Sequence, residues 1–146
     1  MSSAGKTVAV RLRRLRGGLF EATNAGGQKA LIEGSAELGG GMGEGVRPME
    51  ALLMALAGCS ALDVIHILEK QQKEPLGDLD VAVRGLRADA VPAVYTDIAV
   101  DFEASGPVNP AKLERAVKLS MEKYCSVAKM LQPTATITYT VKLREG

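Results

Sequence analysis

The two cysteines of this chain are its strongest candidates for chemistry, because a thiolate is both a nucleophile and a metal ligand. Cys59 lies in PMEALLMALAGCSALDVIHILEK and Cys125 in MEKYCSVAKML, and both stretches are mostly apolar and predict buried helices. If these helices pack together, the sulfur atoms can meet, although a disulfide also needs Cα atoms within about 7 Å. The cysteines are therefore either two inert core thiols or one redox site built from two helices.

Three residues around Cys59 bear on that choice. Gly58 costs a helix about 1 kcal/mol relative to alanine, so we expect a neighbouring helix or a ligand to approach closely there. Asp63 lies one turn further on, on nearly the same helix face, where its carboxylate opposes formation of a thiolate. His66 lies about 10.5 Å along the helix from Cys59, too far for direct contact. A cation that activates Cys59 must therefore come from elsewhere in the chain.

The candidate cations precede the Gly-Gly turn at residues 17–18, and they are Arg13, Arg14 and Arg16. Glu50 is the remaining acid of interest, and it lies in the first turn of the helix that carries Cys59, where an acid complements the helix dipole. About half a helical rotation separates it from Cys59 on a straight helix. We therefore expect Glu50 to serve either its own helix terminus or a site on a second subunit.

Composition narrows the class of protein. The chain has 146 residues, 47% hydrophobic and 24% charged, which predicts one globular domain over residues 1–146. Its formal net charge of +1 gives no support for a nucleic-acid partner. Two cysteines and one histidine are too few for a four-ligand zinc site, so we expect neither a metal ion nor a cofactor. Without a recognisable signal sequence, and with charges interrupting the apolar region at 51–68, we expect a cytoplasmic protein that does not span a membrane.

Hydrophobic periodicity predicts an α+β chain of the order β-β-β-α-β-β-α-β. Three strands form an antiparallel meander, a glycine-rich loop at 35–47 follows, and Pro48 begins a central helix. Asn109 and Pro110 are a good N-cap and first residue for the second helix. The expected strands are 7–16, 19–24, 28–34, 79–88, 95–104 and 135–145, and the expected helices are 48–73 and 110–132.

Two motifs give the chain a specific resemblance. The stretches RPMEALLMALAGCSALDVIHIL and LERAVKLSMEKYCSVAKML resemble the OsmC/Ohr family (osmotically induced protein C and organic hydroperoxide resistance proteins), closest to its uncharacterised OsmC-like branch. The resemblance covers nearly the whole chain in the same order of elements. It implies an intertwined homodimer with two long central helices packed on antiparallel sheets, and two sites at the subunit interface.

The resemblance also implies a reaction, the thiol-dependent reduction of organic hydroperoxides by a cytoplasmic protein of the oxidative stress response. By motif position, Cys59 matches the peroxidatic cysteine and Cys125 the resolving cysteine, whose disulfide a lipoyl-type dithiol reduces. Glu50 matches the family's acid at the start of the central helix. Arg16, in LRGGLF, is the nearest match to the family's activating arginine, offset from it and without the aspartate that follows in the peroxidases.

Two other functions remain open on the same residues. One is a non-catalytic dimeric protein that binds a small molecule or senses redox state through its thiols, which the offset of Arg16 and the presence of Asp63 favour. The other is a different thiol chemistry, such as acyl or thiol transfer through Cys59. Turnover, stoichiometric oxidation and a trapped covalent adduct distinguish the three.

Overall fold

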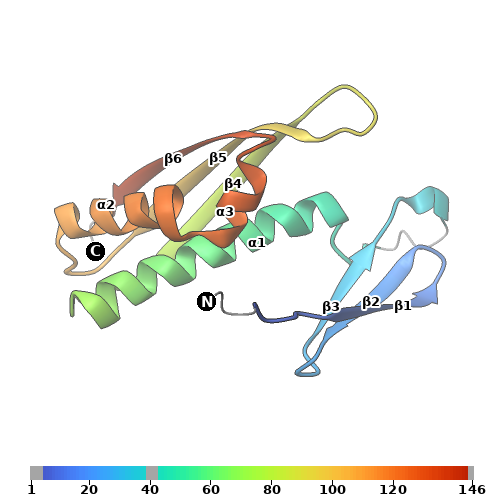
Figure 1. The fold of residues 1–146 in the computed structure, drawn as a ribbon, viewed down its shortest axis with the longest axis horizontal. Helices are drawn as coiled ribbons and strands as arrows, with labels where there is room; N and C mark the ends of the chain where they lie inside the picture. The colour runs from blue at the N-terminus through green and yellow to red at the C-terminus, as the bar shows by residue number, and fades with distance from the viewer. Residues whose placement is uncertain (1–4, 39–42, 145–146) are drawn as a thin grey trace. The chain divides into compact units, whose positions relative to one another are not determined.

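The computed structural model describes residues 5–38 and 43–144, which form two compact units divided between Ala51 and Leu52 (Figure 1). Part of the predicted glycine-rich loop, residues 39–42, lies outside the described residues. The N-terminal unit ends in the first turn of helix α1 (Pro48–Ile65), and the C-terminal unit contains the rest of the chain. That both units belong to a single domain stays a prediction.

The N-terminal unit is the predicted antiparallel meander, with strand order β1-β2-β3. Its strands are β1 (Val10–Arg16), β2 (Leu19–Asn24) and β3 (Lys29–Glu33), and a short 3-10 turn, η1 (Ala36–Leu38), follows. Gly17 has a φ of 48° in the turn between β1 and β2, a conformation that glycine adopts without steric cost. Every residue of β1 is exposed in the chain, including its apolar Val10 and Leu12.

The C-terminal unit is a three-stranded sheet of order β4-β5-β6, with α1, α2 and α3 on the same side of it (Figure 1). Side chains that alternate along β5 are buried, and so are Leu56 and Val64 of α1 and Leu113 and Val117 of α2. Helix α1 continues into a π-helical turn, η2 (His66–Gln71). The elements that follow are β4 (Leu79–Arg87), β5 (Tyr95–Ala104), α2 (Pro110–Leu119), the π-helical turn η3 (Ser120–Tyr124), α3 (Ser126–Leu131) and β6 (Thr136–Leu143).

The α+β class and the order of elements are confirmed, but the sheet of this unit is mixed. Strands β4 and β5 are antiparallel as predicted, whereas β5 and β6 pair in parallel from Asp97↔Thr136 to Ala104↔Leu143. The expectation of purely antiparallel sheets is therefore wrong for β6. The physical reason is the helical crossover between β5 and β6, because a connection of that length returns the chain to start beside the same end of its neighbour.

The start of α2 follows the predicted signal. The side chain of Asn109 accepts a hydrogen bond from the backbone N–H of Lys112 at 3.1 Å, and Pro110 opens the helix. A capped start holds the α2–η3 segment in place, because it satisfies a backbone donor that the helix leaves unpaired. This segment leads directly to Cys125.

Helix α1 is apolar all round, yet only part of it is covered within the chain. Leu56, Ser60 and Val64 are buried, whereas Met54 is 55% and Leu62 67% exposed. By length and composition alone, residues 48–71 form a helix that could cross a membrane, contrary to the expectation from its interrupting charges. One such helix is weak evidence for a membrane segment, because core helices pass the same test. The uncovered apolar side instead needs a protein partner or another apolar environment.

Candidate functional site

Cys59, Asp63 and Cys125 form one cluster in the C-terminal unit. The two Sγ atoms and a carboxylate oxygen of Asp63 all lie within 4.8 Å of one another, and both cysteines are free thiols. Cys59 and Asp63 share a face of α1 because they are one turn apart. The prediction that the two thiols can meet is therefore confirmed. The two cysteines lie on segments that are far apart in the chain.

Cys125 is not inside a helix, and that prediction is wrong. The helical path changes to the π-helical turn η3 after Leu119 and breaks at Cys125, which has φ −70° and ψ 108°. The backbone N–H of Cys125 donates to the carbonyl of Ser120 at 2.8 Å, and its Sγ accepts from the N–H of Ala128 at 3.4 Å. Cys125 thus caps α3, and the break directs its sulfur toward α1.

The two thiols differ in exposure. Cys125 is 3% exposed and Cys59 is half-buried. Burial raises the pKa of the Cys125 thiol to about 11, the neighbouring Cys59 acts in the same direction, and the N–H of Ala128 opposes both. Cys125 is therefore a protonated thiol at neutral pH, whereas Cys59 is the sulfur that a molecule from solvent meets first.

Ser120 fixes the acid of the cluster, and the sequence analysis missed it. Ser120 is fully buried, and its Oγ donates to Oδ2 of Asp63 at 2.9 Å and lies 3.3 Å from the carbonyl oxygen of Ser60. The sequence alone indicates Asp63 only as a negative charge near Cys59. The spacing of Cys59 and Asp63 could have indicated a shared function, but no local signal relates Ser120 to either residue.

The inference drawn from Gly58 finds no support among the described residues. A Cβ built on Gly58 has no described atom within 4 Å, and the residue is exposed. The close approach that we expected does not come from the described part of this chain. The described residues therefore give no packing reason for a helical glycine beside Cys59.

Arg16 and Glu50 belong to the N-terminal unit, and each has a partner there. Arg16 forms an ion pair with Glu44 at the surface, and Oε1 of Glu50 accepts from the backbone N–H of Arg47 at 2.9 Å. Glu50 therefore stabilises the start of α1, which is the helix-terminal role that the sequence indicated. The structure brings Cys59 and Cys125 together and assigns Arg16 and Glu50 to the other unit.

Glu33 is a second functional candidate that the sequence analysis missed. It is 3% exposed, and its Oε1 accepts from the backbone N–H groups of Glu44 and Gly45 at 2.9 and 3.0 Å. Its Oε2 is buried without a hydrogen-bond partner among the described residues. Glu33 thus holds the segment that carries the ion-pair partner of Arg16.

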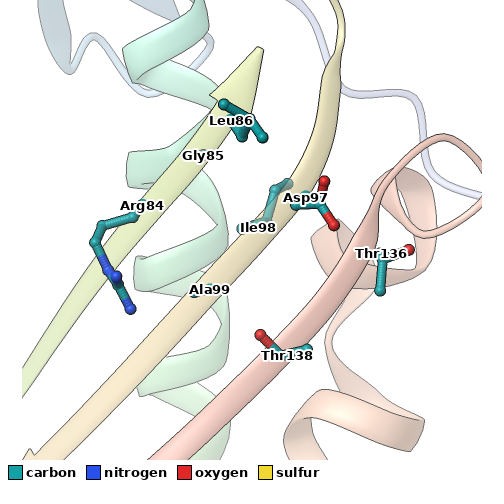
Figure 2. Close-up of a pocket in the computed structure, with 8 residues that line it drawn as sticks. All are labelled: Arg84, Gly85, Leu86, Asp97, Ile98, Ala99, Thr136 and Thr138. Atoms are coloured by element: carbon teal, nitrogen blue, oxygen red, sulfur yellow. The ribbon is translucent and has the colours of Figure 1, made fainter. Parts of the chain in front are cut away.

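The sheet β4-β5-β6 carries a shallow depression of about 270 Å³ on its exposed face (Figure 2). Figure 2 shows residues that line it on all three strands, among them Arg84, Asp97 and Thr138. None of the residues that line it belongs to the cysteine cluster. The depression and the thiol chemistry are therefore separate features.

Comparisons with known proteins agree with this architecture. Residues 41–140 match the family described as "OsmC-like protein". The chain is 35% identical to Protein YhfA of Escherichia coli K12 over 134 residues, which is 91% of this chain and 96% of YhfA. A crystal structure of a hypothetical protein from Aquifex aeolicus is 32% identical and has a TM-score of 0.79, over 96% of this chain and 99% of that one. An organic hydroperoxide resistance protein OsmC from Legionella pneumophila shares the fold at 18% identity, with a TM-score of 0.70 over 96% and 99% of the two chains. The chain therefore belongs to the OsmC-like protein family.

Proposed function

We propose that this protein reduces organic hydroperoxides with Cys59 as the peroxidatic and Cys125 as the resolving cysteine. The observation that carries the proposal is the cluster in which the two free thiols lie within 4.8 Å. Solved structures with the same fold, from Legionella pneumophila and Bacillus subtilis, are described as organic hydroperoxide resistance proteins. Because each is only 18% identical to this chain, these structures support the fold alone. The proposed reaction rests on the two cysteines.

The difference in exposure supports the order of the two thiols in this proposal. The thiolate of Cys59 attacks the terminal oxygen of the hydroperoxide, the O–O bond breaks, and the alkoxide takes a proton and leaves as an alcohol. Cys59 is then a sulfenic acid. The sulfur of Cys125, after losing its proton, attacks that sulfur and releases water, which leaves a Cys59–Cys125 disulfide. A lipoyl-type dithiol restores both thiols and becomes a disulfide itself.

Arg16 and Glu50 enter this proposal by their motif positions. An arginine stabilises a thiolate because its guanidinium stays charged, and an acid fixes the arginine's orientation. We assign the first role to Arg16 and the second to Glu50. In the described structure Arg16 is paired with Glu44, so its role requires that it exchange this surface ion pair, which is worth at most about 1 kcal/mol.

The proposal includes a homodimer in the cytoplasm. Leu52, Met54, Leu62 and Ile65 are exposed on α1, and an apolar helix surface of this kind is stable in water when a second copy covers it. Sedimentation of the reduced protein over a range of concentrations tests the dimer. A monomer at all concentrations contradicts it.

A second function, a thiol-based sensor or binding protein without turnover, is favoured by two observations. Arg16 already has Glu44 as a partner, and the nearest acid to the Cys59 sulfur is Asp63, a residue that the peroxidase mechanism does not use. Such a protein is oxidised once by a hydroperoxide but does not consume it repeatedly.

The deciding experiment measures moles of an organic hydroperoxide consumed per chain with dihydrolipoamide in excess. With the dithiol present, we expect many turnovers for the wild type and none for Cys59→Ser. Without the dithiol, Cys125→Ser should consume one equivalent of hydroperoxide and stop at the sulfenic acid. Arg16→Ala should oxidise at least about tenfold more slowly, and Arg11→Ala, on the same exposed strand, is its matched control. Consumption of one equivalent by the wild type supports the sensor, and no consumption contradicts both functions.

A further inference from the structure

We propose that the reduced protein binds one Zn²⁺ ion through Cys59, Asp63 and Cys125, with a water molecule as the fourth ligand. Three atoms of the kinds that zinc prefers already converge, two thiol sulfurs and one carboxylate oxygen, all within 4.8 Å of one another. Cysteine and histidine alone do not supply this set, because one of its ligands is a carboxylate. The binding needs only reduced thiols and does not rest on the proposed peroxidase reaction.

The distances require a small adjustment. Zn–S bonds of about 2.3 Å at a tetrahedral angle hold two sulfurs about 3.8 Å apart. Ligand atoms that lie within 4.8 Å therefore need to approach one another by no more than about 1 Å. We expect rotation of the half-buried Cys59 side chain on α1 to supply this movement.

The surroundings of the cluster are those of a metal site. Ser120 donates to the Asp63 carboxylate at 2.9 Å and is fully buried, so it fixes one ligand from outside the coordination shell. The N–H of Ala128 donates to the sulfur of Cys125 and stabilises it as a thiolate ligand. Both contacts exist before any ion binds, so the ligands are partly oriented in advance.

Charge explains why an acid lies beside two thiols. The carboxylate of Asp63 lies beside the sulfur atoms of both cysteines. With Zn²⁺ present, the same carboxylate adds attraction, and two thiolates plus one carboxylate leave the site with a net charge of −1. Two Zn–S bonds and one Zn–O bond form, and the two thiol protons pass to solvent. The thiolates select a borderline-soft ion over Mg²⁺ and Ca²⁺, which prefer all-oxygen ligands.

Zinc and the disulfide exclude each other, because each uses both sulfurs. Bound zinc would therefore keep Cys59 and Cys125 reduced and withhold them from a hydroperoxide. This regulatory consequence rests on the proposed function.

The test is a competition titration of the reduced, chelator-treated full-length protein with Zn²⁺ and a chromophoric chelator, under a thiol-free reductant and without peroxide. We expect one zinc per chain. Co²⁺ in place of zinc should give the near-ultraviolet charge-transfer band of thiolate ligands. No zinc uptake in competition, half an ion per chain, or a cobalt spectrum without thiolate bands overturns the proposal.

Variants assign the ligands. Cys59→Ser and Cys125→Ser should each abolish tight zinc binding. Asp63→Asn should weaken the zinc affinity at least tenfold, and Ser120→Ala should weaken it about tenfold. Asp80→Asn, at an exposed position of β4, is the matched control and should bind as the wild type does. Because Cys125 is buried and its variant could fold poorly, Cys59→Ser at the half-buried position repeats the test, with circular dichroism as the check of folding. Unchanged zinc affinity in Asp63→Asn or Cys59→Ser overturns the site, whatever the peroxide assay shows.

Discussion

Oxidation of the reduced protein should join Cys59 and Cys125 in a disulfide that raises the free energy of unfolding by about 4 kcal/mol. The estimate comes from the loop that the bond closes. This loop contains about 67 residues, and the chain-entropy relation for a loop of that length gives about 4.4 kcal/mol at 25 °C. Drawing together sulfurs that lie within 4.8 Å to the bonding distance of about 2 Å costs strain, so the figure is an upper value.

Urea unfolding of the reduced and oxidised forms at one protein concentration measures the difference. With a slope of about 2 kcal/mol per molar urea, the midpoint should rise by about 2 M on oxidation. Intact mass should fall by two hydrogens per chain, and the product should run as a single chain without reductant. Cys59→Ser and Cys125→Ser are the controls, and neither should show the shift.

The result that would refute the reasoning is oxidation without stabilisation. A midpoint that stays within about 0.3 M, together with loss of two hydrogens, would mean that closing the bond strains the fold by as much as the loop gains. A dimer linked between chains would mean that the two thiols of one chain do not react with each other. Two intact thiols after excess hydroperoxide would make Cys59 and Cys125 inert.

Other predictions follow from single contacts. Gly58→Ala should raise the free energy of unfolding by about 1 kcal/mol in urea, because the new Cβ meets open space; a loss of stability would reveal a partner packed there. Ser120→Ala should lower it by about 1–2 kcal/mol, since Asp63 loses its buried donor; an unchanged midpoint contradicts this. The hydrogen bond to Glu122 raises the pKa of Tyr139 to about 12. This hydrogen bond should therefore contribute fully to the free energy of unfolding below about pH 10, and the contribution should be lost as the pH rises toward 12. The Tyr139→Phe variant should be less stable at neutral pH and should not show this additional loss at alkaline pH. Parallel pH curves for both proteins would contradict it.

Local patterns in the sequence were sufficient for much of the fold. Alternation of apolar and polar residues located the strands, and the bounds of β5 agree with the predicted 95–104. Asn109 and Pro110 located the start of α2, because capping depends on residues within one turn. The shared helix face of Cys59 and Asp63 also followed from sequence alone, since helical periodicity fixes which neighbours face the same way.

Three features depended on the tertiary structure. The parallel pairing of β6 follows from how the helical crossover packs, which no pattern within β6 encodes. The break at Cys125 depends on the π-helical turn before it, where the apolar periodicity of the sequence continues without interruption. Likewise, Arg16 pairs with Glu44, whose backbone N–H donates to the buried carboxylate of Glu33.

The sequence by itself determined that this chain has two cysteines in the motifs of one family, and that Cys59 shares its helix face with an acid. Only the tertiary structure decided that Cys125 joins them and that Ser120 holds Asp63. The reason is physical: residues on one helix are positioned by local backbone geometry, whereas residues far apart in the chain meet only through packing of the core. The chemistry of the cluster, whether redox or metal binding, depends on that meeting.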